Sequence, residues 1–179
     1  MNFKIYNLLN PISQENYNDI YNLFENSFPE NERRSRKNQE KLINNNYYNI
    51  LTAIDEKNEL LGFMFFWNFN DFIYVEHFAI NTEKRNMGLG GKFLDYLKQN
   101  YNNIILEVEH PLEEMSIRRI GFYERCGFFI NEYDYIQPAM QKGLKPLPLK
   151  IMSYPAKINN EFYKKVEKLL HNVVYNIEF

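Results

Sequence analysis

The sequence predicts a single mixed α/β (α+β) domain, with helices flanking a central, mostly antiparallel mixed sheet and a C-terminal helical extension. Three observations predict this class. The chain has 179 residues, 45% of them hydrophobic, which is enough for one substantial core. Three strand-like runs joined by short turns precede alternating helical and strand-like segments. The last apolar pattern, from Asn160 onward, has helical spacing.

The N-terminal half contains one strand and two helices before it settles into three consecutive strands. Ser13 can cap the first helix, and Pro29 ends it. The apolar period then changes to two, and short turns rich in Asp and Asn separate the strands. The expected elements are a strand at 3–9, helices at 14–26 and 32–43, and strands at 48–54, 60–67 and 72–80.

Helices and strands alternate in the C-terminal half, up to a loop rich in lysine and proline. We place the domain at residues 1–155 and an amphipathic helix in residues 156–179. That helix packs either on the same domain or at a homodimer interface, and its periodicity does not choose between them. The expected elements are helices at 88–100 and 113–126, strands at 104–108, 128–135 and 149–154, and a helix from Asn160 onward.

Composition and charge exclude several kinds of protein. A formal net charge of -2 gives no electrostatic case for nucleic acid binding. The only dense basic run, residues 33–37, is flanked by glutamates and indicates a solvated helix face. One cysteine and three scattered histidines provide no metal-ligand motif. No membrane-length apolar run or signal-peptide core is visible, so we expect a soluble cytoplasmic protein without a metal.

Glycines cluster where the helix at 88–100 begins. Gly88, Gly90 and Gly91 let the backbone approach a bulky anion, while the first helical N–H groups remain free to donate. Arg85 can add a charge-assisted contact. The loop therefore predicts a site for a pyrophosphate.

Two nucleotide-binding motifs that also use glycine loops do not fit this one. A P-loop ends in Gly-Lys-Ser/Thr, whereas Gly91-Lys92 is followed here by Phe93. A dinucleotide fingerprint belongs after the first strand of a parallel sheet, whereas this loop follows three antiparallel strands. Both motifs are therefore excluded.

Two segments of the chain resemble motifs of the GNAT superfamily of N-acetyltransferases. The run Arg85-Asn86-Met87-Gly88-Leu89-Gly90 is similar to the family's coenzyme A loop, Arg/Gln-x-x-Gly-x-Gly/Ala. Residues 122–128, Phe-Tyr-Glu-Arg-Cys-Gly-Phe, are similar to its aromatic-Tyr-x-x-x-Gly-Phe segment. The resemblance covers residues 3–154 in element order. It implies a GNAT-like domain that uses acetyl-CoA as acyl-donor cosubstrate.

The resemblance also implies which residues bind the donor. The backbone of the strand around Ala79 would hold the pantetheine arm. Many relatives have Asn where this chain has Ser116. The side chain that could contact the donor from this position is therefore shorter here. The expected donor-binding residues are Phe78, Ala79, Ile80, Arg85, Asn86, Met87, Gly88, Leu89, Gly90, Gly91, Ser116 and Tyr123.

Tyr123 lies where the resemblance places the acid that protonates the departing thiolate. A tyrosine hydroxyl can also orient the donor's sulfur. The alternative is a core aromatic with its hydroxyl at the surface, because Phe122 and Phe128 beside it are packing residues.

Three glutamates are candidates for the acceptor side. Glu76 lies among apolar strand residues, with His77 expected on the opposite face, and partial burial would make it a suitable general base. Its alternative is an exposed residue paired with a cation. Strand alternation places Glu107 and Glu109 on one face, where they can attract a cationic amine or orient an arginine. We rank Glu76 first as base and the other two as acceptor-site carboxylates.

The leading hypothesis is an N-acetyltransferase in which a primary amine attacks the acetyl group directly in a ternary complex. An acyl-enzyme on Cys126 is disfavoured, because a helix C-terminus disfavours a thiolate. The acceptor can be a small-molecule amine or a protein amine. The alternatives are a catalytically silent acyl-CoA-binding or sensing module, and transfer of a longer acyl group.

Overall fold

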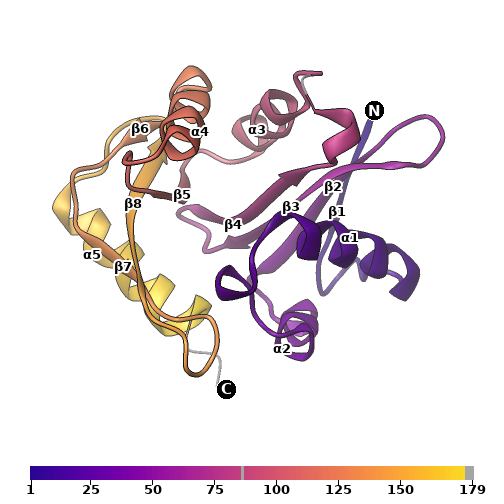
Figure 1. The fold of residues 1–179 in the computed structure, drawn as a ribbon, viewed down its shortest axis with the longest axis horizontal. Coiled ribbons are helices and arrows are strands. Elements are labelled where there is room, and N and C mark those ends of the chain that lie inside the picture. Colours follow the sequence, from indigo (N-terminus) through magenta and orange to yellow (C-terminus); the bar gives the residue numbers. More distant parts are fainter. Residues whose placement is uncertain (86, 176–179) are drawn as a thin grey trace.

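The computed structural model describes residues 1–85 and 87–175, and one mixed sheet separates two groups of helices in it (Figure 1). The strands are β1 (Asn2–Tyr6), β2 (Tyr48–Ile54), β3 (Leu60–Asn68), β4 (Ile73–Ile80), β5 (Ile104–Glu109), β6 (Phe129–Ile130), β7 (Tyr135–Gln137) and β8 (Leu147–Tyr154). The α-helices are α1 (Gln14–Ser27), α2 (Arg36–Lys41), α3 (Leu89–Asn100), α4 (Glu114–Arg125) and α5 (Asn160–Leu169), and short 3₁₀ turns cover Glu30–Glu32, Leu42–Asn44 and Thr82–Lys84.

The strands run in the order β1-β2-β3-β4-β5-β8-β6, and β7 also pairs with β8. Among the described strand pairs, only β4 and β5 are parallel. The predicted mixed, mostly antiparallel sheet is therefore confirmed. The expected meander is present as β2, β3 and β4, with Asn58 and Asn70 at positive φ in its two turns.

Each face of the sheet has its own core. Helices α3 and α4 cover one face, and α1, α2 and α5 cover the other (Figure 1). Phe93 and Leu94 of α3 are fully buried in the first core. Phe24 of α1 and Val166 of α5 are fully buried in the second. The C-terminal helix therefore packs on the sheet of its own chain, in a segment that also includes a π-helical turn at Leu170–Val174.

The sheet splits in its middle, and this split positions the site. β4 and β5 pair only from 73–75 to 104–106, although both strands continue further. A β-bulge lies at the same place, since Phe65 of β3 pairs with His77 while Phe66 pairs with Val75. Glu76 is the extra residue. A bulge bends its strand and re-aims the side chains beside it, and β4 leaves β5 just beyond it (Figure 1).

Local capping accounts for three differences from the expected elements. The second helix begins at Arg36 because the Ser35 side chain caps it by accepting from the N–H of Asn38. The first strand ends at Tyr6, where the Asn7 side chain closes a turn. The single strand expected at 128–135 is two short strands, because the Asn131 side chain bonds to neighbouring backbone between them.

No helix among the described residues is long and apolar enough to cross a membrane.

Candidate active site

A cavity of about 490 Å³ lies where β4 and β5 separate. The end of β4, the loop before α3, the first turn of α3 and one face of α4 form its walls. Met87 is largely exposed and is not among its lining residues, and Asn86 lies outside the described residues. The expected donor-site residues that do line the cavity are Phe78, Ala79, Ile80, Arg85, Gly88, Leu89, Gly90, Gly91 and Tyr123.

The backbone of the glycine loop provides an open cradle. Gly88 is the N-cap of α3 at φ 68°, in the left-handed region that favours glycine. A Cβ at Gly88 or Gly91 would meet no atom within 4 Å, so space lies above both residues. The first N–H groups of α3 have no partner within the helix. These features fit a diphosphate.

Ser116 has a structural role in α4. Its hydroxyl accepts from the Glu113 N–H at 3.2 Å and donates to the Glu113 carbonyl at 2.8 Å, which completes a capping box at the helix start. The residue is buried and does not line the cavity. A contact between Ser116 and the acyl donor therefore stays a prediction. The hydroxyl of Ser116 is already hydrogen-bonded to the backbone of Glu113.

Tyr123 lies on α4 between its aromatic neighbours and the cavity. Its ring contacts those of Phe122 and Phe128, so the packing role considered from the sequence is real. Its hydroxyl makes no hydrogen bond with any described residue. Burial raises the pKa of Tyr123 to about 12. The phenol therefore stays protonated at neutral pH and can donate a proton into the cavity.

The bulge turns the Glu76 carboxylate into the interior. One oxygen lies 2.6 Å from Nη1 of Arg34, and the other accepts from the Trp67 indole N–H at 3.1 Å. The two charged side chains are 0% and 3% exposed. His77 lies on the same side, with Nδ1 3.9 Å from the carboxylate. The expectation that Glu76 and His77 lie on opposite faces is wrong, because the bulge breaks the alternation.

Arg34 does more than balance this charge. Its Nη2 donates to the carbonyl of Val174 at 2.8 Å, which ties the C-terminal segment to the site. The expectation that residues 33–37 form a solvated helix face is wrong for Arg34, which is buried. Helix α2 begins only at Arg36, so Arg34 precedes the helix and its side chain turns inward.

Glu107 lies on β5 at the point where the cavity ends. Its Oε2 accepts from the Tyr175 hydroxyl at 2.8 Å and from the Gln137 amide at 2.7 Å. Its Oε1 is buried and makes no hydrogen bond with any described residue. Burial raises the pKa of Glu107, and the hydroxyl and amide donors around it act in the opposite direction.

A second cavity, of about 200 Å³, adjoins the first. Phe28, Glu76, Glu107 and Arg119 line both cavities, so Glu107 lies at their junction. The four carboxylates of the second cavity are those of Glu32, Glu76, Glu107 and Glu109.

The placement of Glu107 and Glu109 on one face of β5 is confirmed, because both are partly exposed while Val108 between them is buried in the core under α3 and α4. Glu109 pairs with Nη1 of Arg119 at 2.5 and 2.6 Å, so the arginine-orienting role considered for these glutamates is present. Glu32 is a site residue that sequence reasoning missed. Burial raises its pKa, and the nearby carboxylate of Glu109 adds to the effect.

Tyr175 and Gln137 were also missed, because no periodicity or motif links the C-terminal helix or β7 to β5. Cys126 caps the end of α4, as expected, and burial raises the pKa of its thiol. Among residues 1–85 and 87–175, no group of three or more His, Cys, Asp or Glu side chains is placed to hold a metal ion.

Comparison with known proteins identifies the family. Residues 17–128 match the Acetyltransferase (GNAT) family. A solved structure from Bacteroides thetaiotaomicron, provisionally assigned as a GNAT acetyltransferase, is 32% identical to this chain. It superimposes with a TM-score of 0.89, and the match covers 99% of this chain and 100% of that one. The chain belongs to the GNAT family of acetyltransferases, and the fold expected from the resemblance is confirmed.

Two further relatives match over less of the chain, one of them at lower identity. A Bacillus subtilis (strain 168) protein, provisionally named acetyltransferase YjbC, is 33% identical over 104 residues. That match covers 56% of this chain and 52% of YjbC, so it spans about half the length of this curated relative. Spermidine N-acetyltransferase from Vibrio cholerae, in complex with CoA and spermine, is 19% identical over 84% of this chain and 94% of its own. With a TM-score of 0.56, it shares the fold.

Proposed function

We propose that the protein transfers the acetyl group of acetyl-CoA to a primary amine by direct attack in a ternary complex. The observation that supports this most is the junction of two unlike cavities at Glu107. One begins at the glycine loop and reaches Tyr123, and the other is lined by carboxylates. The first suits an acyl donor with a diphosphate, and the second suits a cationic amine.

The donor side rests on the loop before α3. Acetyl-CoA supplies the acetyl group as a thioester, and its diphosphate would meet the free N–H groups of the first turn of α3 and the Arg85 side chain. The unpaired end of β4 offers the backbone groups of Phe78 and Ile80, on either side of Ala79, to the pantetheine arm, since β4 no longer pairs with β5 there. No metal enters the proposal.

The acceptor amine must lose a proton before attack, because a free alkylamine has a pKa of about 10.4. Both Glu76 and Glu107 line the two cavities, but Glu107 has one oxygen without a hydrogen bond to a described residue, whereas Glu76 is held in a buried ion pair with Arg34. We therefore assign the role of proton acceptor to Glu107 and a structural role to Glu76. From the sequence, Glu76 was the first-ranked general base.

Protons and bonds balance in this scheme. The amine nitrogen forms a bond to the acetyl carbon as the carbon–sulfur bond breaks. The cationic amine gives one proton to Glu107 before it attacks, and its nitrogen loses a second proton to solvent as the amide forms. Tyr123 gives a proton to the sulfur, so the products are an amide and the free thiol of CoA. Solvent exchange then returns both residues to their starting states. Cys126 takes no part.

The acceptor class follows from the second cavity. A volume of about 200 Å³ admits an alkylamine or the end of a lysine-like side chain. Glu32 and Glu107, the two lining carboxylates outside the arginine ion pairs, favour a cation, and the presence of spermine in the distant Vibrio cholerae structure agrees with this chemistry. Small-molecule and protein amines both remain acceptors in the proposal.

The test is release of free thiol from acetyl-CoA with a panel of primary amines, checked by the mass of the acetylated product. Tyr123→Phe is expected to lower kcat by about 100-fold, since it removes the proton donor to the leaving group. Its affinity for CoA, measured by calorimetry, should stay close to that of the parent protein. CoA binding with no thiol release from any amine would instead favour a catalytically silent acyl-CoA-binding module.

A further inference from the structure

We infer that Tyr175, at the end of the C-terminal helical segment, positions the Glu107 carboxylate for proton transfer, so that this segment is part of the active site. The inference rests on the proposed acetyl transfer and extends it to a part of the chain beyond the family match at residues 17–128. It assigns Tyr175 a positioning role, since its hydroxyl acts through Glu107.

Three elements meet at one carboxylate oxygen of Glu107, and β4 joins them through the Tyr175 hydroxyl. The Tyr175 hydroxyl donates to Oε2 of Glu107 at 2.8 Å, and the Gln137 amide of β7 donates to the same oxygen at 2.7 Å. The Gln137 amide also donates to the Tyr175 hydroxyl at 3.0 Å. The hydroxyls of Tyr74 and Tyr175 lie 2.7 Å apart. Because Tyr175 gives its only proton to Glu107, Tyr74 of β4 must donate to Tyr175.

These bonds determine which oxygen is available for chemistry. With both donors on Oε2, the carboxylate cannot rotate without breaking two short hydrogen bonds. Oε1 is left as the oxygen that has no hydrogen bond to a described residue, and the Glu107 side chain itself lines both cavities. A general base must be held within hydrogen-bond reach of the proton that it removes. The network therefore holds the Glu107 carboxylate in one orientation beside the two cavities.

The segment that carries Tyr175 is itself anchored. Val166, Leu170 and Val174 are fully buried against the sheet, which holds the helix in place. The π-helical turn then brings the chain inward, and the Tyr175 N–H donates to the carbonyl of Leu170. Arg34 adds a hydrogen bond to the carbonyl of Val174. Its partner Glu76 thus supports the C-terminal segment from the opposite side of the site.

The charges around Glu107 all belong to the same site. They are the Glu76–Arg34 and Glu109–Arg119 ion pairs and the carboxylate of Glu32. The imidazole of His77 is kept neutral because burial lowers its pKa. The titratable groups are Tyr74 and the Glu76–Arg34 pair, the Glu109–Arg119 pair on β5 and α4, Tyr135 on β7, Tyr175, and across the second cavity Glu32 and His77.

The experiment compares three conservative variants of the full chain with acetyl-CoA and an active amine. Glu107→Gln keeps the shape of the side chain and is expected to lower kcat by 100-fold or more, with CoA affinity retained. Tyr175→Phe removes one hydroxyl and is expected to lower kcat by about tenfold, the equivalent of one hydrogen bond. Tyr163→Phe is the matched control, because its hydroxyl on α5 bonds to Glu167 and to the carbonyl of Asp134, away from the site.

The pH profile separates positioning from mere stability. A donor to the ionised carboxylate lowers its pKa, so Tyr175→Phe should move the acidic limb of kcat/KM to higher pH while Tyr163→Phe leaves it in place. A carbon-13 NMR titration of the Glu107 carboxyl in the free protein should show the same upward move. An unmoved limb and an unmoved carboxyl titration in Tyr175→Phe would overturn the inference, as would full activity in Glu107→Gln.

Failure of the proposed function gives a different result. If the parent protein acetylates no amine, that function is wrong, yet the NMR titration still decides whether Tyr175 controls Glu107. If Glu76→Gln abolishes turnover in a folded protein while Glu107→Gln does not, acetyl transfer stands and the assignment of Glu107 falls.

Discussion

Glu76 shows how one extra residue in a strand changes the role of a side chain. On a regular strand the carboxylate would alternate with its neighbours, but at the bulge it turns into the interior against Arg34. Removal of either charge from water costs several kcal/mol, which the partner offsets. The pair therefore exists as a unit, and loss of one member leaves the other buried and uncompensated.

Glu76→Gln is expected to lower the free energy of unfolding by about 3–5 kcal/mol, because Arg34 then lacks its counter-charge. Urea denaturation measures the effect. The matched control is Glu109→Gln, which breaks the half-exposed pair with Arg119 and is expected to cost less than about 1 kcal/mol. Equal losses in the two variants would show that the buried pair has no special structural role.

At the scale of the element, the start of α3 combines two glycines with different requirements. Gly88 needs its left-handed backbone, whereas Gly91 lies inside the first turn with an ordinary helical φ. Neither would bring a new Cβ into contact with another atom. Alanine at each position therefore separates backbone conformation from the space above the loop.

Gly88→Ala is expected to lower the free energy of unfolding by about 1–2 kcal/mol, the cost of a left-handed residue with a Cβ. Gly91→Ala should raise it by about 0.5 kcal/mol through helix propensity. If CoA lies on the loop, Gly91→Ala should nevertheless weaken CoA binding by about tenfold, because the new methyl group occupies part of the cradle. Calorimetry would contradict the donor site if CoA bound both variants as it binds the parent protein.

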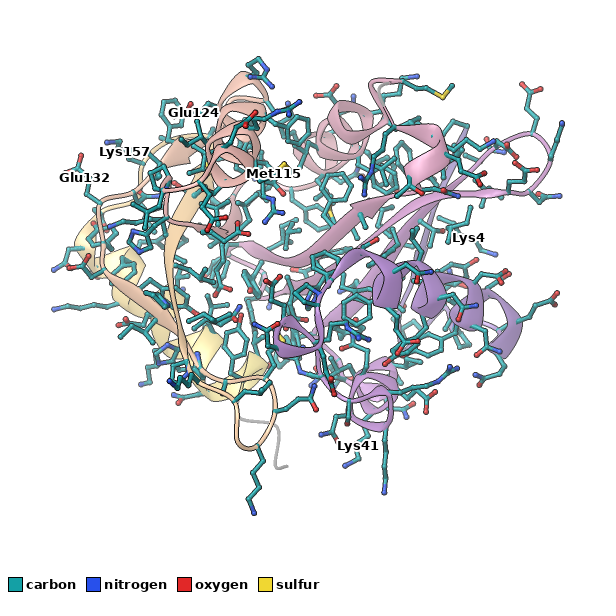
Figure 2. All side chains as sticks on the ribbon, viewed as in Figure 1. Lys4, Lys41, Met115, Glu124, Glu132 and Lys157 are labelled. Carbon is teal, nitrogen blue, oxygen red and sulfur yellow. The ribbon has the colours of Figure 1, made fainter. Side chains whose placement is uncertain are left out.

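At the scale of the whole molecule, the side chains fill the space between the layers and bring distant segments together (Figure 2). Arg34 near the N-terminus and Val174 near the C-terminus form a buried hydrogen bond, and His77 of β4 donates from Nε2 to the carbonyl of Glu32. His77 also contacts the rings of Phe24 and Phe28. A titratable ring in this position couples the global stability to pH.

Burial lowers the pKa of His77 below its ordinary value of 6.5. Below pH 6.5 the unfolded chain therefore binds more protons at this residue than the native protein, so stability falls as the pH falls. His77→Gln should reduce the loss of stability between pH 7.5 and 5.5, by at most about 1.4 kcal/mol for each pH unit below 6.5. Thermal melts at the two pH values measure it.

Glu107 and Glu32 act in the opposite direction over a lower range. Their raised pKa values mean that the native protein binds more protons than the unfolded chain just above the ordinary glutamate range, so acidification through that window stabilises. In His77→Gln, where the opposing effect of His77 is removed, the stabilisation by acidification should become visible. An unchanged pH dependence in the variant would show that His77 does not titrate with folding.

Local sequence signals predicted most elements of the fold. β2 begins and ends where the alternation of apolar residues does, and α1 begins after Ser13 as its cap requires. The glycine loop and the Tyr123 segment predicted the family and the wall of the first cavity, because the two motifs in this order are more specific together than either is alone. These signals are local, since each depends on residues within one turn or one strand.

The acceptor side depends on contacts that no local pattern contains. The bulge at Glu76 reversed its expected orientation, and the inward turn of Arg34 removed it from a run of solvated charges. The donors to Glu107 come from β7 and from the C-terminal segment, 30 and 68 residues away in the chain. Periodicity could predict that the last helix is amphipathic, but not which surface it covers.

The sequence by itself therefore determined the order of the elements, the family and the loop suited to a donor diphosphate, because helix caps, strand periods and glycine turns depend on neighbouring residues. Only the tertiary structure decided which carboxylate is held in a buried ion pair and which keeps an oxygen without a hydrogen bond to a described residue. The physical reason is that the environment of a buried charge is set by every segment that packs around it. Here those segments include the last helix of the chain.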